Sequence, residues 1–425
     1  MQRRGPSEGG DVVDSAPAAD LVQVPRYGPL VGFLLRIRAL VNTGRLQDAL
    51  DEIDVYEWVA AAFGDDTTVE NMIQRRMYTY FDLHQYESAL AVGEQLVARR
   101  RAAGNLLGEA KTLADLAELC LLTGRLTEGM RHLARSGLLL ESTSLRNHHY
   151  LTALSSYSDA AVAAGLYETA AAFYDEYYTG YASDAEGYVE DAYSRLLVSW
   201  GLWLDHLGHT FEAEQRLRRA AAIAERWLTT FGDEAGVADV QVLTGVRALA
   251  LAKLGEADEA VAVAKPLIAS LRAGSYVRPA AWTAHLALSI ALRAAGDHPA
   301  AHRELLAAQH LVGLDSTSDD LLLVEYELAT ANAEALGREV CGPMITALQK
   351  QAHVIWRQRR QRLAMLHQAR QREELEIEHA HTNAALLTDA LTGLGNRRRF
   401  DEIAAAVQAG AVSLPLSLLI IDVDK

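Results

Sequence analysis

Apolar residues recur along most of the chain at the spacing of one face of an α-helix. The clearest stretch has one apolar stripe before Gly124 and a second stripe after it. Its members are Leu113, Leu116, Ala117, Cys120 and Leu121 on one side, and Leu126, Met130 and Leu133 on the other. Spacings of three and four residues predict two amphipathic helices, each with one buried face, joined by a short turn at the glycine.

This pattern repeats, with a small residue five positions after each turn residue. The pairs are Gly44 with Ala49, His84 with Ala89, Gly124 with Gly129, Gly165 with Ala170, Gly208 with Ala213, Gly255 with Ala260, Gly296 with Ala301, and Gly337 with Gly342. Successive turns are 40 to 47 residues apart, which is room for two helices of about 14 residues and two short connections. Glycine suits the turn because many helices end on a left-handed residue, and the small residue lets the two helices cross closely.

About eight helical hairpins are therefore predicted over residues 25–347. One hairpin cannot cover its own apolar stripe, so neighbouring hairpins must stack into an elongated superhelix. The repeats resemble the tetratricopeptide superfamily in a long form, since their period exceeds the usual length of about 34 residues. This resemblance implies an all-α solenoid that serves as a platform for a protein, a peptide or a small signal. Residues 1–24 lack the periodicity and are expected to form a disordered tail.

Composition and charge narrow the classes of partner. Half of the 425 residues are apolar and only nine are proline, which favours helices. A net charge of −16 argues against a nucleic-acid-binding surface, because phosphate contacts need clustered positive charge. The chain has neither an apolar run long enough to span a membrane nor the apolar core of a signal peptide. We therefore expect a cytoplasmic protein, with Cys120 and Cys341 as reduced core thiols.

Tyrosines and acidic residues are concentrated in one part of the array. Nine of the sixteen tyrosines lie between Tyr150 and Tyr193, in a stretch without lysine or arginine. Four of them share one face of a predicted helix: Tyr174, Tyr177, Tyr178 and Tyr181. These side chains either pack between repeats beneath an acidic rim or line an aromatic, acidic groove for a cationic ligand or a basic peptide.

A long helix is expected to follow the array, over residues 348–388. No glycine or proline occurs between Lys350 and Thr392, and the part from Leu348 to Arg372 carries seven lysines and arginines but no acidic residue. The heptad positions, eight of them apolar, are Trp356, Arg359, Leu363, Leu366, Arg370, Glu373, Ile377, Ala380, Ala384, Leu387 and Leu391. They predict a weak parallel coiled coil that joins two copies into a homodimer. The alternatives are a solvated helix that caps the array, or a basic segment that docks on the acidic array in a resting state through contacts that salt weakens.

The sequence at and after Asp389 is more specific. It reads DALTGLGNRRRF, then a helix-like DEIAAAVQAG, then the apolar run LSLLII. Gly393 and Gly395 break the long helix, and Asn396 is a good N-cap for the helix that follows. The apolar run predicts a buried parallel strand with Asp422 at its carboxyl end, where open α/β sheets bind ligands. Residues 389–425 resemble the start of a GGDEF diguanylate cyclase domain, of which they form an incomplete α/β piece.

This resemblance implies a metal ion, a substrate and a hinge. The Asp422 carboxylate and the Val423 main-chain carbonyl would hold Mg²⁺, which bridges the phosphates of GTP. Asp389, Arg397 and Arg398 match the hinge motif of the family and would position the domain. The phosphate-binding loop, the guanine-contacting residues and the GGDEF signature would all lie after Lys425, so we expect no cyclase activity from this chain itself.

Two functions follow. The favoured one is the regulatory and dimerising region of a cytosolic diguanylate cyclase, which makes cyclic di-GMP from two molecules of GTP. The alternative is a non-catalytic scaffold or adaptor whose repeats bind a protein, a peptide or a small signal.

Overall fold

The structure is a computed structural model, which describes residues 30–42, 44–181, 188–233, 236–273, 278–313, 320–389 and 391–409. The chain divides into two compact units, one that ends at Leu366 and one that begins at His367. The boundary lies inside one long helix, α17 (Arg338–Leu386).

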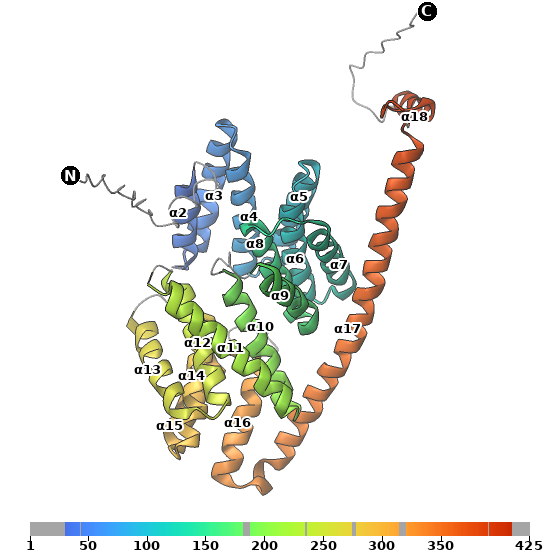
Figure 1. Ribbon diagram of the computed structural model, residues 1–425. Helices are drawn as coiled ribbons and strands as arrows, with labels where there is room; N and C mark the ends of the chain where they lie inside the picture. The colour runs from blue at the N-terminus through green and yellow to red at the C-terminus, as the bar shows by residue number, and fades with distance from the viewer. Residues whose placement is uncertain are drawn as a thin grey trace, which may run out of the picture. The chain divides into compact units, whose positions relative to one another are not determined.

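The first unit is a stack of antiparallel helical hairpins (Figure 1). The pairs are α2 (Val31–Asn42) with α3 (Leu46–Ala62), α4 (Asp66–Asp82) with α5 (Tyr86–Ala102), α6 (Leu106–Leu122) with α7 (Leu126–Ser142), α8 (His148–Ala163) with α9 (Tyr167–Tyr181), α10 (Tyr188–His206) with α11 (Thr210–Phe231), α12 (Val237–Lys253) with α13 (Ala257–Ala273), α14 (Arg278–Ala294) with α15 (His298–Gly313), and α16 (Asp320–Leu336) with the first part of α17. The prediction of an α-solenoid of about eight hairpins is confirmed.

The turn inside each hairpin has the predicted left-handed residue. Its φ angle is positive in every case, from +57° at His84 to +94° at Gly337. At Gly124, the next N–H, that of Arg125, donates to the carbonyl oxygen of Cys120 at 2.7 Å. This bond satisfies a carbonyl group that the end of the helix would otherwise leave free. Gly64 and Gly104 make the same turn between hairpins, which the repeat pattern did not predict.

The small residue five positions after the turn lies where the two helices of a hairpin cross. Ala49 and Ala89 are fully buried, and a Cβ atom on Gly129 would come within 3.1 Å of the Ala117 carbonyl oxygen. A larger side chain there would push the helices apart. The eighth pair differs from this prediction, because no described atom lies within 4 Å of the Cβ position of Gly342.

The first helices of neighbouring hairpins pack on one another, and the superhelix then closes on itself. Helix α8 contacts α6 and α10, α12 contacts α10 and α14, and α16 returns to contact α10. Across this closure the ring centroids of Tyr326 and His206 are 3.7 Å apart. Lys253 of α12 forms ion pairs with Glu327 of α16 at 2.5 Å and with Asp205 of α10 at 2.7 Å. The first helices therefore surround an interior space.

Helix α17 continues without a break from the last hairpin into the predicted linker. It includes Pro343 and passes through the predicted boundary between residues 347 and 348 as regular helix. The eighth hairpin and the linker thus share one helix. Pairing of two linkers stays a prediction.

The second unit contains the end of α17, the connecting residues 387–389 and 391–396, and α18 (Arg397–Gln408). Asn396 caps α18 as predicted, with its side chain accepting a hydrogen bond from the N–H of Arg399. The part of the chain that the structure describes contains no strand. The predicted strand, Asp422, Val423 and the tail over residues 1–24 lie outside the described residues. Among the described helices, none has the apolar length that a bilayer span needs.

Candidate functional site

A cavity of about 670 Å³ lies within the first unit, between the inner faces of the first helices. Its apolar wall includes Leu202 and Trp203 of α10, Val246 of α12 and Trp282 of α14. The polar side chains that also line it include Glu118, Asp159, Arg195, Thr283, Asp320 and Arg362. A concave space with aromatic walls and a few converging polar groups is typical of ligand sites.

One end of the cavity is acidic. Arg195 forms ion pairs with Asp159 at 3.3 Å and with Asp191 at 3.4 Å, and its guanidinium is therefore committed to two carboxylates. Burial, followed by the charges of Asp159 and Asp115, raises the pKa of Glu118 to about 8. Burial also raises the pKa of Asp159. This end of the cavity holds more carboxyl groups than Arg195 neutralises.

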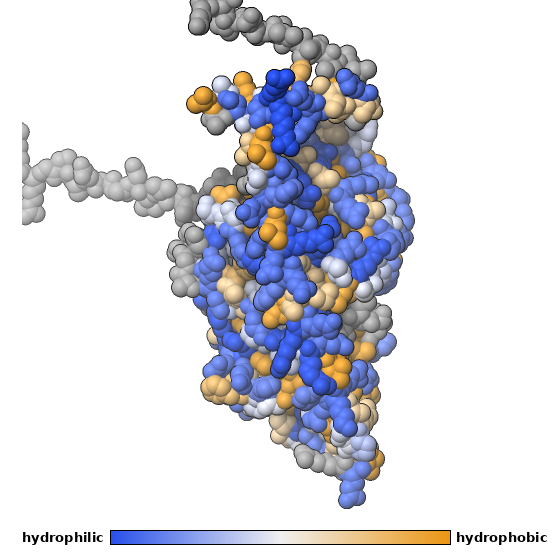
Figure 2. Space-filling view, turned by 90° about the vertical axis from the view of Figure 1, so that its right-hand side faces the viewer, coloured by the Kyte–Doolittle hydropathy of each residue, from blue (hydrophilic) through white to orange (hydrophobic). Residues whose placement is uncertain are grey.

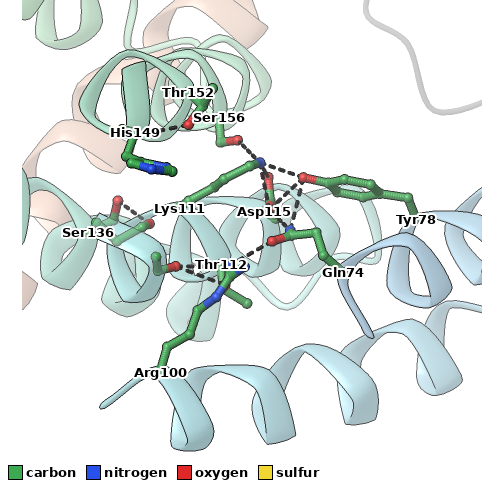
Figure 3. A network of polar contacts seen from close by, with 12 residues as sticks. Gln74, Tyr78, Arg100, Lys111, Thr112, Asp115, Ser136, His149, Thr152 and Ser156 are labelled. Carbon is green, nitrogen blue, oxygen red and sulfur yellow. Dashed lines mark hydrogen bonds and ion pairs between the residues drawn. The ribbon is translucent and has the colours of Figure 1, made fainter. Parts of the chain in front are cut away.

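A polar network fixes helix α6 beside this acidic end. Figure 3 shows Lys111 at its centre, reaching the Tyr78 hydroxyl at 2.5 Å, the Ser156 hydroxyl at 2.8 Å and the Asp115 carboxylate at 3.3 Å. The Gln74 amide donates to the same carboxylate at 2.6 Å. Burial acts to lower the pKa of Lys111, but Asp115 and Tyr78 outweigh it and raise the pKa. Because these residues come from α4, α6 and α8, they hold three successive hairpins in register.

The acidic end was not predicted, although the sequence carries a signal for it. Glu118 and Asp159 both lie six residues before a turn glycine, Gly124 and Gly165. The same position in the next hairpin is Leu202, which also lines the cavity. In these three successive hairpins the position six residues before the turn glycine lines the cavity, a signal that the apolar stripes within one repeat do not give.

The predicted tyrosine face lies in the packing between repeats. Tyr174 and Tyr177 are each only 1% exposed, and the ring of Tyr174 stacks on that of Tyr193 with centroids 4.6 Å apart. These two side chains do not line an open groove, because helices α8, α9 and α10 pack around them. The side chains of Tyr178 and Tyr181 lie outside the described residues, so their part in a ligand groove stays a prediction.

Arginines from neighbouring segments of the array pair with acidic residues of the stretch around the tyrosines. Arg146 pairs with Glu176 at 3.0 Å, and Arg219 pairs with Asp175 at 2.6 Å. Arg219 also lies over the ring of Tyr193, 4.9 Å from its centroid. The stretch contains no basic residue of its own, but the fold supplies the counter-charges from elsewhere in the array.

Helix α17 contacts the array at the turn between α8 and α9, within the first unit. The ring of Trp356 stacks near Tyr167 and Trp203, with centroids 6.3 and 6.4 Å away. Both of these aromatic residues also line the cavity. The Trp356 ring therefore lies against part of the cavity wall.

Two arginines extend this contact of α17. Arg359 pairs with Glu168, and its guanidinium lies 4.2 Å from the centroid of the Trp356 ring. Arg362 donates to the Ala164 carbonyl oxygen at 3.1 Å and also lines the cavity. The predicted docking of the basic segment on an acidic array is thus seen at these positions.

On the face in Figure 2, hydrophilic residues predominate and apolar ones are scattered among them, so this face presents no single broad apolar patch.

The hinge motif forms a defined turn in the second unit. The Asp389 carboxylate accepts hydrogen bonds from the Thr392 N–H at 2.9 Å and the Thr392 hydroxyl at 2.8 Å, and these bonds lower the pKa of Asp389. The Asn396 side chain donates to the Leu386 carbonyl oxygen at 2.8 Å. Arg397 and Arg398 are exposed on α18. The turn therefore sets the direction in which α18 leaves α17, while the roles implied for Asp389, Arg397 and Arg398 stay predictions.

No family model matches this chain, and no curated protein sequence matches it. Among solved structures, it is similar to a Rap protein complexed with competence and sporulation factor, at 14% identity, with 79% of this chain and 89% of that chain covered and a TM-score of 0.43. It is also similar to a tetratricopeptide repeat protein from Parabacteroides merdae, at 14% identity, with 70% and 98% covered and a TM-score of 0.36. A third is the tetratricopeptide domain of P58(IPK), at 13% identity, with 72% and 98% covered and a TM-score of 0.22. The assignment of the array as an α-solenoid rests on the hairpins, turns and stacking described above.

Proposed function

We propose that the first unit is a binding module that takes a peptide or a small molecule in its central cavity. The observation that carries this proposal is the cavity itself, which is surrounded by the first helices and is lined by Arg362 of α17 as well. A ligand at that wall would touch the array and α17 at once. Binding would therefore change how firmly α17 is held.

The ligand that fits this cavity carries a cationic nitrogen on an apolar body. A protonated amine or a guanidinium at the acidic end would lie beside Glu118 and Asp159, whose pKa values are raised chiefly by burial. The apolar body would lie against Trp203 and Trp282. The binding of a cation should return Glu118 to its ionised form, so binding is coupled to the release of a proton.

Short blocked peptides test this proposal. Acetyl-Leu-Arg-Leu-amide should quench the tryptophan fluorescence of the chain and bind in calorimetry, whereas the matched peptides with Gln or Glu at the centre should not. Glu118→Gln should weaken the binding of the arginine peptide by about tenfold, since a charge-assisted contact is lost. The exposed Glu94→Gln serves as the control. Equal binding of all three peptides, or no binding of the arginine peptide, would count against a cation site in the cavity.

The readout of binding is proposed to pass through α17. Trp356 and Arg359 are heptad positions of the predicted coiled coil, and both are engaged with the array. The same side chains cannot pack on the array and on a second copy of the helix. Docked and paired states of α17 would thus exclude each other, and release from the array would favour a homodimer.

A second candidate function, the sensory part of a diguanylate cyclase, is favoured by the sequence from Asp389 onward. The side chains of Asp389 and Asn396 form hydrogen bonds within the connection between α17 and α18, which suits a hinge. In this proposal GTP is the substrate, and Mg²⁺ is held by Asp422 and Val423. Formation of cyclic di-GMP from GTP and Mg²⁺ by the longest natural form of the protein tests it, with Asp422→Asn as the variant that should abolish the product. If no cyclic di-GMP forms, the diguanylate cyclase proposal is refuted and the binding-module proposal remains.

A further inference from the structure

The third hairpin brings together three side chains that are suited to hold a metal ion. The Cys120 thiol of α6 and the Glu128 carboxylate and His132 imidazole of α7 have their ligand atoms all within 4.8 Å of one another. The cluster lies between the two helices of one hairpin and belongs neither to the cavity lining nor to the hinge motif. We propose that Cys120, Glu128 and His132 form a site for a zinc-class divalent ion.

The repeat geometry explains why these groups meet. Gly129 lets α7 approach α6 so closely that a Cβ atom there would come within 3.2 Å of the Cys120 Cβ atom. Glu128 and His132 are four residues apart on α7, so they project from the same face of that helix. Both helices are anchored by the turn at Gly124, which fixes their relative position. The backbone therefore holds the three side chains near one another without any metal.

Other hairpins have the same backbone but not the same side chains. The Cys120, Glu128 and His132 positions lie four residues before the turn residue and four and eight residues after it. In the fifth hairpin these positions hold Leu204, Glu212 and Arg216, and in the sixth they hold Leu251, Glu259 and Val263. The set of sulfur, nitrogen and oxygen ligands at this register is thus a property of the third hairpin rather than of the repeat.

The chemistry of the three groups selects the class of ion. Thiolate and imidazole are preferred ligands of zinc and cobalt, whereas Mg²⁺ and Ca²⁺ prefer oxygen alone. Ligand atoms around a tetrahedral zinc ion lie roughly 3.3 to 3.6 Å apart, and rotation of the partly exposed Glu128 and His132 side chains can close the remaining distance. The ion binds the neutral imidazole, which is an ordinary form of histidine at pH 7 and above.

Binding would displace the proton of the Cys120 thiol. The ion binds the thiolate, so a cysteine in its ordinary thiol form must lose a proton on binding. The metal forms a bond to the sulfur while the proton passes to solvent, and water can fill the fourth position on the ion. Binding should therefore strengthen as the pH rises.

Cobalt titration of the full chain, after chelator treatment and under reducing conditions, tests the site. Wild-type protein should show a thiolate-to-Co²⁺ charge-transfer band in the near ultraviolet, and one equivalent of Zn²⁺ should remove it. Cys120→Ser should lose the band, whereas Cys341→Ser, which changes the only other cysteine, should keep it. His132→Gln should raise the dissociation constant by at least about tenfold, while the exposed His302→Gln should leave it unchanged.

The result that would overturn the site is the absence of the band from wild-type protein, or its survival in Cys120→Ser. Circular dichroism shows whether each variant keeps its helices. If Cys120→Ser does not fold, His132→Gln decides, because it changes a partly exposed side chain; unchanged cobalt affinity in that variant would refute the proposal.

Discussion

Arg359 of helix α17 forms an ion pair with Glu168 at the start of α9, and the two residues are 191 positions apart in the chain. The pair joins the last helix of the first unit to the fourth hairpin. Since the same guanidinium lies over the Trp356 ring, a charge contact and an aromatic contact support one another. This contact is the part of the structure through which binding in the array can reach the linker.

Loss of the aromatic contact should loosen α17. Trp356→Ala removes the ring that lies near Tyr167 and Trp203, so we expect faster hydrogen exchange of the backbone amides over residues 356–366, by about tenfold for a loss of about 1.4 kcal/mol. Hydrogen–deuterium exchange with mass spectrometry measures it. The control is Val354→Ala, since Val354 is 44% exposed on the same helix. Equal exchange in both variants would show that Trp356 does not hold the helix.

The loss of a proton from Glu118 should lower the stability of the fold as the pH rises. Its folded pKa of about 8 lies above the ordinary 4.5, so the folded state binds the proton more tightly than the unfolded state does. The favourable contribution is complete below pH 4.5 and is lost between that pH and about 8. Glu118→Gln cannot ionise, and its free energy of unfolding at pH 9 should exceed that of the wild type by about 1 kcal/mol or more. Urea unfolding at pH 5 and pH 9 measures the free energy of unfolding of each variant, with Glu94→Gln as control. If this free energy depends on pH in the same way in the wild type and in Glu118→Gln, the predicted role of Glu118 is refuted.

Glu327 should have the opposite pH dependence. Burial alone would raise its pKa, but Lys253 and Arg293 lower it to about 2. The ionised carboxylate therefore stabilises the fold above pH 4.5, and the contribution is lost as the pH falls toward 2. Glu327→Gln removes the buried carboxylate that Lys253 and Arg293 share and leaves each cation only its second, more exposed partner, so it should cost about 3 to 5 kcal/mol at pH 7. Thermal unfolding measures the stability of Glu327→Gln and of the control Glu334→Gln, which changes a more exposed partner of Arg293 at 3.4 Å. Similar losses of stability in both variants would contradict the central role of Glu327.

Replacement of His84 by glycine should make the fold more stable. Among the described residues other than glycine, it is the one with a positive φ angle, +57°. An L-residue pays a steric cost there that glycine avoids, so His84→Gly should raise the free energy of unfolding by about 0.5 to 1 kcal/mol. The converse change, Gly124→Ala at φ +79°, should lower it by about 1 kcal/mol. Chemical unfolding of both variants tests the pair, and a destabilised His84→Gly would show that the histidine makes a compensating contact, such as its 2.8 Å bond to the Tyr86 hydroxyl.

The hairpins could be predicted from sequence because each depends on residues close together in the chain. A left-handed turn residue and a small residue at +5 are local requirements, and they recur in register from Gly44 onward. The cavity could not be predicted in this way, because its lining comes from helices spread between α4 and α17. The same holds for the buried Tyr174 and Tyr177, whose surroundings come from three different helices.

The docking of α17 was anticipated as a charge effect, but the residues that make it were not. Positive charge on residues 350–372 and negative charge on the array give attraction without a location. The location depends on shape, because Trp356 lies near the aromatic pair Tyr167 and Trp203, and this brings Arg359 to Glu168.

The most direct test of coupling between the array and the linker is the self-association of Glu168→Arg, measured by analytical ultracentrifugation. This change removes the array's half of the ion pair and leaves the coiled-coil sequence intact, while Asp258→Arg alters the equivalent position of another hairpin, three residues after its turn glycine. We predict that Glu168→Arg dimerises about two- to fivefold more tightly than the wild type, which corresponds to about 0.4 to 1 kcal/mol. Asp258→Arg should dimerise as the wild type does. Identical association constants for wild type and Glu168→Arg would contradict the claim that docking and pairing of α17 compete.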